Sequence, residues 1–537
     1  MPDKKAKKGE ATSKNIPNDK NVRQKEKLDF RPFIAFLALV AAIAVALPLN
    51  PLRNDESIGD VKESMNIDNG DLKINWQRYP TTEIELEKSL TIQKSGTYHL
   101  TGALENGLIK ISAGDGIVRL ILDNVSINHD DGPVIYCDSA NDLVIELVGD
   151  NSISDGESYD TEYDEEVGAA IYTQSDLTFQ GDGKLTVDAN YQDGIVSKDD
   201  LKFNGGTYDI VSKDDAIRGT DSVYVVSGNF IIKSTADAIK STNDIDATKG
   251  FVYIENGNFN IKTDAKGIKS TKTVLISDGK IVIESHDDAI HSDNYIAIKG
   301  SDININSGDD AIHANSNLII DGGDITVFRA YEGLEAQKIT INQGVISLTT
   351  NDDGINAGGG ADASSTNRPG ANPFDADEEC VIDINDGDIY INSSGDGIDS
   401  NGWVNINGGH IVVDGPTNNG NGALDSGLGI IINGGDAIAV GSSGMVESFG
   451  NNSKINNISI YLDNERPADT KVSIKDDAGE TIIEHTSAKK FSSITAGSNQ
   501  LKLGGTYSLY LNDQKVKDFI ISDITTIVGN NRNNFRK

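Results

Sequence analysis

A short phrase, Asp-(Ala/Gly)-Ile, recurs at a nearly fixed interval and constrains the fold more than any other feature of the chain. Its first clear copies begin at Asp193, Asp215 and Asp237, in steps of 22 residues. Later copies begin, after a step of 29 and then mostly steps of 21 or 22, at Lys266, Asp288, Asp310, Glu332, Asp353, Asp396 and, more weakly, Gly422. The 43-residue step before Asp396 contains a low-complexity segment, 357–379. Such a period predicts stacked repeats rather than a compact globular core.

A glycine keeps the same interval and predicts a tight turn in each repeat. The turn glycines are Gly206, Gly228, Gly257, Gly279, Gly300, Gly323, Gly344, Gly387, Gly409 and Gly435. Between the turns lie short apolar runs, as in LIIDGGDITVF, with no helical period. Three short strands and three turns fill 22 residues. We therefore predict an all-β fold, a right-handed parallel β-helix with three strands per rung, over residues 81–450. A leucine-rich repeat is excluded because its leucine signature and helix are missing.

The two ends of the chain differ from the repeat. Residues 451–530 alternate short strands with other turns and are predicted to form a small C-terminal β unit that covers the open end of the helix, followed by a tail at 531–537. Residues 1–31 are basic, and 32–49 form an uncharged apolar run long enough to span a bilayer. We predict a basic cytoplasmic segment, a single transmembrane anchor, a linker over 50–80 and an extracellular bulk. The alternative for 32–49 is a cleaved signal peptide, which would make the protein secreted.

Stacked rungs bring equivalent residues about 4.8 Å apart, so the acid that begins each phrase joins a column of carboxylates. With a formal net charge of −36 the chain is not expected to bind nucleic acid. Carboxylates at this spacing repel one another unless a cation lies among them, and calcium is the ion that prefers oxygen ligands. The alternative is that each Asp caps a turn through its own backbone contacts. The predicted calcium ligands are Asp287, Asp288, Asp309, Asp310, Glu332, Glu335, Asp352, Asp353, Asp396 and Asp399.

The residue after each Ile forms a second column, which we expect to point away from the core. In chain order it holds Val196, Arg218, Lys240, Lys269, His291, His313, Glu335, Asn356 and Asp399. One interpretation is a strip that binds an extended anionic polymer; the other is that the cations neutralise the neighbouring acids. The tyrosine and arginine before Glu332 add a stacking ring and a guanidinium. The predicted carbohydrate-binding residues are Arg218, Lys240, Lys269, His291, His313, Arg329 and Tyr331.

Several phrases resemble a family of bacterial surface-anchored β-helix proteins that are described as carbohydrate-binding and have folds like pectate lyases. They include SGTYHLTGALENGLIKI, DLTFQGDGKLTV, YQDGIVSKDDLKFNGGTYDIVSKDDAIRG, DGGDITVFRAYEGLEA and, near the C-terminus, KKFSSITAGSNQLKLGGTYSLYLND. The resemblance covers roughly residues 80–528. It implies a right-handed β-helix, calcium held by rung carboxylates, and binding of cellulose-type or uronic-acid-rich polysaccharide.

Two other functions remain open from the residues. A calcium-dependent polysaccharide lyase needs a base beside a cation that acidifies the C5 proton of a uronate, and Lys338, Arg329 and Lys269 are candidates. Fold analogy alone does not decide between lyase and binding protein. The third candidate is a structural surface protein or adhesin, whose acidic rungs would only hold a stiffening calcium ion.

Overall fold

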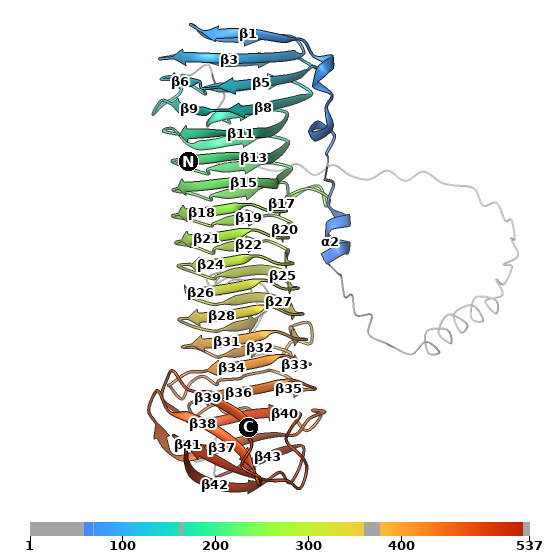
Figure 1. Ribbon diagram of the computed structural model, residues 1–537, viewed down its shortest axis with the longest axis vertical. Helices are drawn as coiled ribbons and strands as arrows, with labels where there is room; N and C mark the ends of the chain where they lie inside the picture. The colour runs from blue at the N-terminus through green and yellow to red at the C-terminus, as the bar shows by residue number, and fades with distance from the viewer. Residues whose placement is uncertain (1–57, 68, 161–162, 164–165, 359–375, 530–537) are drawn as a thin grey trace, which may run out of the picture. The chain divides into compact units, whose positions relative to one another are not determined.

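The computed structural model describes residues 58–67, 69–160, 163, 166–358 and 376–529. These residues form an all-β solenoid in which strands from successive turns lie side by side, with a further group of strands at the C-terminal end (Figure 1). Along the solenoid, the strand pairs are parallel, as a chain that winds in one direction requires. The predicted all-β solenoid is confirmed.

Most turns of the solenoid contribute one strand to each of three parallel sheets. The first sheet contains β1 (Thr81–Leu86), β3 (Gly96–Leu104), β5 (Ile117–Asp123), β8 (Asp142–Val148), β11 (Asp176–Asp188), β13 (Asp200–Val211), β15 (Ser222–Ser234), β17 (Phe251–Ile254), β20 (Thr273–Ile276), β23 (Tyr295–Ile298), β25 (Ile312–Ile320), β27 (Leu334–Ile341), β30 (Val381–Ile384), β33 (Trp403–Ile406) and β35 (Gly429–Ile432). The strands β25 and β27 enter this sheet only with their second halves.

The second sheet follows the first across the glycine turn. It takes the second halves of β3, β11, β13 and β15, together with β6 (Ser126–His129), β9 (Asp150–Asp155), β18 (Asn258–Thr263), β21 (Lys280–Ser285), β24 (Asp302–Asn306), β26 (Asp324–Ala330), β28 (Val345–Thr350), β31 (Asp388–Ser393), β34 (His410–Asp414) and β36 (Asp436–Gly441).

The third sheet carries the recurring phrase. It contains β2 (Leu90–Ile92), β4 (Ile109–Ser112), β7 (Ile135–Ser139), β10 (Ala169–Thr173), β12 (Asp193–Ser197), β14 (Ile217–Gly219), β16 (Ile239–Ser241), β19 (Ile268–Ser270), β22 (Ile290–Ser292), the first halves of β25 and β27, β29 (Ile355–Ala357) and β32 (Ile398–Ser400).

Strand register confirms the repeat that the sequence predicts. Ile195 pairs with Ile217 and Ile217 with Ile239, and the same column continues through every later phrase to Ile398. These isoleucines, and Leu334 in the same column, are buried in a single core. The residue after each Ile points away from that core because side chains alternate along a strand.

The turn between the first and second sheets explains the periodic glycine. Nine of the ten predicted turn glycines have a positive φ, Gly300 being the exception. At Gly228, φ is 155° and a Cβ would come within 2.8 Å of the Phe230 ring. Both the backbone conformation and the close approach therefore favour glycine there.

The segment just before the solenoid packs on its first sheet. Helix α2 (Ile58–Ser64) places Val61 against a cluster that includes Tyr253. Two short 3-10 helices follow, η1 (Asp71–Lys73) and η2 (Trp76–Arg78). Asp71 Oδ2 lies 3.0 Å from Lys202 Nζ, and both side chains are buried. Part of the region 50–80, predicted as a linker, is thus packed against β13 and β17; the contact depends on partners more than 100 residues away, which local patterns do not reveal.

At the C-terminal end, the strands are β37 (Asn457–Arg466), β38 (Lys471–Asp476), β39 (Thr481–Thr486), β40 (Phe491–Ser498), β41 (Thr506–Leu511), β42 (Gln514–Ile520) and β43 (Thr525–Val528). Strand β40 pairs antiparallel with both β36 and β37, whereas β38, β39, β41 and β42 form a separate antiparallel sheet. Buried Asp414, the last residue of β34, accepts hydrogen bonds from His485 (2.8 Å), Ser487 (3.0 Å) and Tyr390 (2.9 Å). These contacts fix the C-terminal strands to the last turns.

Within the described residues, no helix has the length and apolarity needed to cross a bilayer. The predicted transmembrane anchor or signal, 32–49, lies outside them, as do the basic segment 1–31 and the tail 531–537. Their assignment stays a prediction.

Candidate functional site

The phrase acids use one carboxylate oxygen to tie successive rungs together. The Oδ1 of Asp193 accepts a hydrogen bond from the backbone N–H of Asp215 at 3.0 Å, and Asp215 Oδ1 does the same for Asp237. The contact repeats down the column, from Asp237 to Lys266, Asp288 to Asp310, Asp310 to Glu332 and Asp353 to Asp396. The phrase acids therefore do accept backbone N–H groups, as the turn-capping alternative predicts. The N–H belongs to the next rung, however, and not to the rung of the acid itself. This contact uses one oxygen of each carboxylate and leaves the other oxygen for a cation.

In the N-terminal half of this acid column, defined here as the rungs from Asp193 to Asp288, lysine and arginine supply that cation. Lys240 Nζ lies 3.1 Å from Asp215 Oδ2 and 3.0 Å from Asp237 Oδ2. Arg218 bonds Asp193 Oδ2 at 2.5 Å. Each cation lies between the acid of its own rung and that of the previous rung, so it bridges the stack.

Two further lysines extend the same pattern. Lys269 Nζ is 3.8 Å from Asp237 Oδ2. Lys266, which replaces the phrase acid in its own rung, reaches Asp287 at 2.7 Å and Asp288 at 2.6 Å. Burial opposes the charged form of Lys266, but the two acids outweigh it and raise its pKa. The N-terminal half is thus neutralised by the chain itself.

The C-terminal half of the acid column, the rungs from Asp310 to Asp399, has a different composition. The residues after the Ile are here His313, Glu335, Asn356 and Asp399. Among the described residues, no lysine or arginine forms an ion pair with Asp310, Glu332, Glu335, Asp352, Asp353, Asp396 or Asp399. This half therefore concentrates carboxylates without a permanent positive charge.

Burial raises the pKa values of these acids, as it also raises those of Asp193 and Asp215 in the N-terminal half. Burial, with repulsion from Glu332 and Asp310, raises the pKa of Glu335 to about 11. Burial and the charges of Asp396 and its neighbours raise the pKa of Asp353 to about 8, and burial raises that of Asp396 to about 7. The pKa of Glu332 is also raised well above its usual range, by burial first and then by Asp310. In each case the charged form lacks a compensating cation.

One group of side chains in this half could bind a metal ion through oxygen atoms alone. We call it the oxygen-donor centre; its residues are Glu332, Asp352, Asp353, Asn356, Asp396 and Asp399. Asn356 donates through Nδ2 to Glu332 Oε2 at 2.9 Å, while its buried Oδ1 has no hydrogen-bond partner among the described residues. A Cβ at Gly395 would come within 2.2 Å of Asp352 and 2.3 Å of Asp353, so glycine leaves room for these two carboxylates. An unpartnered amide oxygen among carboxylates fits calcium chemistry.

The two histidines lie at the boundary between the halves. Their rings are 5.0 Å apart and belong to adjacent rungs. His291 contacts Asp288 and Asp293 through its two ring nitrogens, at 2.8 and 3.0 Å. Although burial opposes it, these contacts raise the pKa of His291, and the contacts of His291 and Lys266 hold the pKa of Asp288 well below its usual range. His313 is only 1% exposed.

The predicted carbohydrate-binding residues therefore divide into two groups. Arg218, Lys240 and Lys269 are half-buried and engaged with the acid column, and both histidines are buried. Neutralisation of the acids accounts for their contacts, whereas polymer binding by this column stays a prediction. Arg329 and Tyr331 are exposed.

The lyase candidates do not converge in the structure. Lys269 lies in β19 of the third sheet, Arg329 in β26 of the second, and Lys338 in the part of β27 that belongs to the first. Lys338 and Arg329 are exposed, whereas Lys269 faces Asp237. The structure thus gives no cluster in which these three would share one substrate carboxylate.

A β-bulge exposes Phe328, which the sequence pattern did not reveal, near the predicted Arg329 and Tyr331. The register of β26 shifts against β24 after Ile305 and against β28 after Val327. At this irregularity Phe328 is 56% exposed, next to exposed Arg329, and Tyr331 is 43% exposed. A hydrogen bond to Asp352 raises the pKa of Tyr331 to about 12. The bulge thus exposes two aromatic rings and a guanidinium, of which Tyr331 contacts Asp352 of the oxygen-donor centre.

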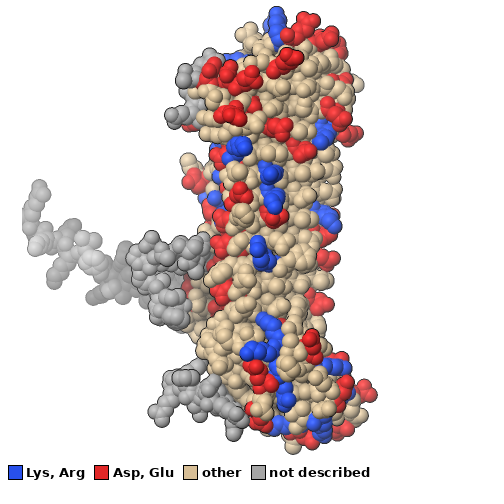
Figure 2. Space-filling view, turned by 90° about the vertical axis from the view of Figure 1, so that its left-hand side faces the viewer, with Lys and Arg blue, Asp and Glu red and all other residues tan. Residues whose placement is uncertain are grey.

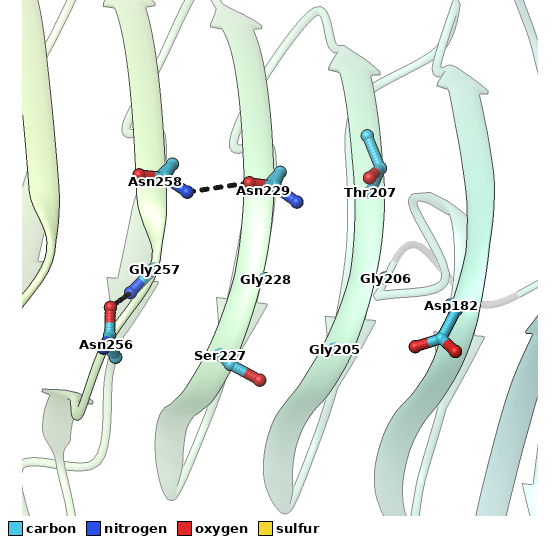
Figure 3. A pocket seen from close by; sticks show the side chains of 10 residues that line it. All are labelled: Asp182, Gly205, Gly206, Thr207, Ser227, Gly228, Asn229, Asn256, Gly257 and Asn258. Carbon is cyan, nitrogen blue, oxygen red and sulfur yellow. Dashed lines mark hydrogen bonds between the residues drawn. The ribbon is translucent and has the colours of Figure 1, made fainter.

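A second surface feature is a groove of about 390 Å³ along the glycine turns, where the first sheet passes into the second (Figure 3). Asn229 and Asn258 lie on adjacent strands, and Asn258 donates to Asn229 at 2.8 Å. Asp182 is the one charged residue in the lining; the others are Gly205, Gly206, Thr207, Ser227, Gly228, Asn229, Asn256, Gly257 and Asn258. The groove therefore offers amides and hydroxyls. Elsewhere, acidic side chains with interspersed basic ones extend along the face shown in Figure 2.

Comparison with known proteins bears on these surfaces. Residues 86–333 match the model of a family described as carbohydrate-binding domain-containing proteins. The resemblance to carbohydrate-binding β-helix proteins is confirmed. A relative with the same description, from Acetivibrio thermocellus, is 36% identical over 155 residues, which are 28% of this chain and 53% of that protein. The chain thus matches about half the length of this curated relative.

A solved structure also resembles part of the chain. It is the gadolinium derivative of a polysaccharide lyase-like protein from C. thermocellum, with 29% sequence identity and a TM-score of 0.38. The likeness covers 42% of this chain and 96% of that one.

Proposed function

We propose that this protein is an extracytoplasmic carbohydrate-binding protein that recognises cellulose-type or acidic polysaccharide and is stabilised by calcium. The observation that carries the proposal is the family match over residues 86–333. The matched stretch contains the amide-lined groove and, near its end, the exposed Phe328, Arg329 and Tyr331. We further propose a right-handed winding, with the C-terminal strands as a cap and residues 32–49 as a membrane anchor or signal.

The aromatic patch at the bulge is the surface we propose for an acidic polymer. Phe328 and Tyr331 offer ring faces for sugar stacking, and Arg329 offers a fork of N–H donors that matches a uronate carboxylate. Calcium in the adjacent oxygen-donor centre would add a positive charge beside the same surface. The attractions of Arg329 and of a calcium ion for uronate carboxylates are electrostatic. Binding of polygalacturonate should therefore weaken when salt is added and when a chelator removes calcium.

The groove in Figure 3 suits a neutral polymer instead. Its lining offers hydrogen-bond donors and acceptors from Asn229, Asn258 and Thr207, and its charged residue, Asp182, would repel a polyuronate. Strand spacing repeats these groups along the solenoid axis, which matches an extended chain better than a single sugar. Cellulose-type binding at this groove should depend little on salt or calcium.

The residues of the oxygen-donor centre would hold calcium. Glu332, Asp353 and Asp396 supply carboxylates, and the unpartnered Oδ1 of Asn356 supplies a neutral oxygen. A divalent ion there would offset the repulsion that raises the pKa values of these acids. Its role in the proposal is to stabilise the rungs and to support the neighbouring surface.

The test is binding of polygalacturonate and cellulose by the full-length protein, with calcium and then with EDTA, while absorbance is followed for unsaturated products. We expect binding without product. The substitutions Phe328→Ala and Tyr331→Ala should weaken polygalacturonate binding, and Asn229→Ala with Asn258→Ala should weaken cellulose binding. Val345→Ala, which truncates an exposed side chain of the second sheet, is the matched control.

The outcomes separate the candidate functions. Formation of unsaturated product would replace the binding protein with a lyase and make Lys338, Arg329 and Lys269 the residues to substitute. Absence of binding to either polymer would contradict the proposal and favour the structural surface protein.

A further inference from the structure

His313 is the buried polar group whose environment the protein alone leaves unexplained. It is 1% exposed, and neither of its ring nitrogens has a hydrogen-bond partner among the described residues. Its neighbour His291 has both nitrogens engaged, so the difference is specific to one rung. A buried imidazole without partners costs free energy, and such groups call for a specific explanation.

The donors that face His313 Nδ1 are carboxylate oxygens from three rungs. Asp310 Oδ2 and Glu335 Oε2 both lie 3.4 Å away, and Asp288 Oδ2 lies 3.7 Å away. These separations are too long for good hydrogen bonds. They match the edge of a tetrahedron around a metal ion with bonds of roughly 2.1 Å, which is about 3.4 Å. Asp310, His313 and Glu335 are all buried, and their donor atoms lie within 4.8 Å of one another.

The identity of the donors selects the kind of ion. Calcium binds oxygen, whereas imidazole nitrogen with carboxylate oxygen suits zinc and related first-row divalent ions. Asp288 is already engaged by Lys266 and His291, which leaves Asp310, His313 and Glu335 as the available three donors. Three protein donors would leave a fourth position on the ion for Asp288 Oδ2 or for water.

We infer that Asp310, His313 and Glu335 form a binding centre for one divalent ion of the zinc class, separate from the oxygen-donor centre. The inference rests on the proposed function, in which cations bind to this acid column. It adds a second class of ion, held by Asp310, His313 and Glu335 instead of by the oxygen-donor centre. At the boundary between the two halves, the ion lies among the acids in the way that Lys240 lies between Asp215 and Asp237 in earlier rungs. It bonds Nδ1 of His313 with the ring in its neutral form, and so gives that buried nitrogen a partner.

The test is calorimetric titration of the EDTA-treated, dialysed full-length protein with zinc alone, in buffer that contains millimolar calcium. We expect about one zinc ion per chain to bind despite the calcium. The substitution His313→Asn should weaken zinc binding by more than about 100-fold, because loss of a direct ligand exceeds the 10- to 100-fold effect of an outer-shell partner. His410→Asn, which removes an exposed histidine, is the matched control and should leave zinc affinity unchanged.

A second measurement does not depend on the folding of the variant. X-ray absorption at the zinc edge of the wild-type complex should show scattering from one imidazole together with oxygen ligands. An all-oxygen shell, or equal zinc affinity in wild type and His313→Asn, would overturn the inference and identify an adventitious ion only.

Two further measurements separate an error in the zinc centre from an error in the proposed function. Calcium titration and polysaccharide binding of His313→Asn report on the oxygen-donor centre and on the carbohydrate surface. If both are normal while wild-type protein fails to bind zinc, the zinc centre is wrong and the proposed function stands. Normal zinc binding without calcium or polysaccharide binding would contradict the proposed function alone.

Discussion

The two halves of the acid column share one backbone arrangement but differ in how their charge is balanced. In both, a carboxylate oxygen accepts the N–H of the next rung, as at Asp193 and again at Asp353. In the N-terminal half the residue after the Ile is a permanent cation in three rungs. Arg218 and Lys240 each lie between two phrase acids, and Lys269 lies 3.8 Å from Asp237. In the C-terminal half this position holds histidine, acid or amide. One side chain per rung thus decides whether a permanent positive charge of the chain itself lies among the acids.

Breaking the built-in bridge should give the largest effect. Lys240→Met removes the cation between Asp215 and Asp237. These buried carboxylates then keep only longer contacts, of Asp215 with Arg218 at 4.0 Å and of Asp237 with Lys269 at 3.8 Å. We expect the free energy of unfolding to fall by about 3 kcal/mol, measured by urea denaturation. Lys280→Met, which breaks the exposed pair with Asp302, should change it by no more than about 0.5 kcal/mol. Equal losses in the two variants would contradict the distinction between buried bridge and surface pair.

Supplying the bound cation should stabilise the C-terminal half. At a calcium concentration about 100 times the dissociation constant, the free energy of unfolding should rise by about 2.7 kcal/mol over the value in EDTA. The measurement is thermal or urea unfolding in the two buffers. The double variant Asp353→Asn with Asp396→Asn should show little response to calcium, and a full response in that variant would place the ion elsewhere.

A lysine can be placed in the C-terminal half at the position that carries Lys240 in the N-terminal half. Asn356 occupies, between Glu332 and Asp353, the position that Lys240 occupies between Asp215 and Asp237. Asn356→Lys should therefore stabilise the calcium-free protein by about 1.5 kcal/mol through charged hydrogen bonds. Its response to calcium should be lost at the same time. Asn304→Lys, on a different sheet, is the control and should leave the calcium response intact.

Stability should also depend on pH in the absence of metal. The pKa values of Asp353 and Asp396 are raised to about 8 and about 7 in the folded protein, above their values near 4 in the unfolded chain. The folded state binds the extra protons, so this contribution to stability is present below about pH 4 and is lost as pH rises through 7 to 8. In EDTA, unfolding midpoints should thus decline between pH 5 and pH 8. Saturating calcium should flatten or reverse that decline, and an unchanged profile would argue against the oxygen-donor centre.

Periodicity allowed the solenoid to be predicted because each rung contributes the same inward Ile and the same turn glycine. The Asp column was visible for the same reason, and so was the change from Lys269 to His291 and His313. The sequence did not reveal that the Oδ1 of each acid binds the next rung, since the direction of a side chain within a turn depends on packing. The exposure of Phe328 follows from a bulge that no local pattern marks. The partnership of Asp71 with Lys202 joins segments far apart in the chain.

The central claim is that the C-terminal half of the acid column binds the cation that the N-terminal half contains. The most direct measurement is calorimetric titration of calcium into the metal-free full-length protein and into the Asp353→Asn, Asp396→Asn variant. We expect saturable binding by the wild type and loss of that binding in the variant, with circular dichroism showing that the variant keeps its fold. Absence of calcium binding by the wild type at millimolar concentrations, or undiminished binding by the variant, would contradict it.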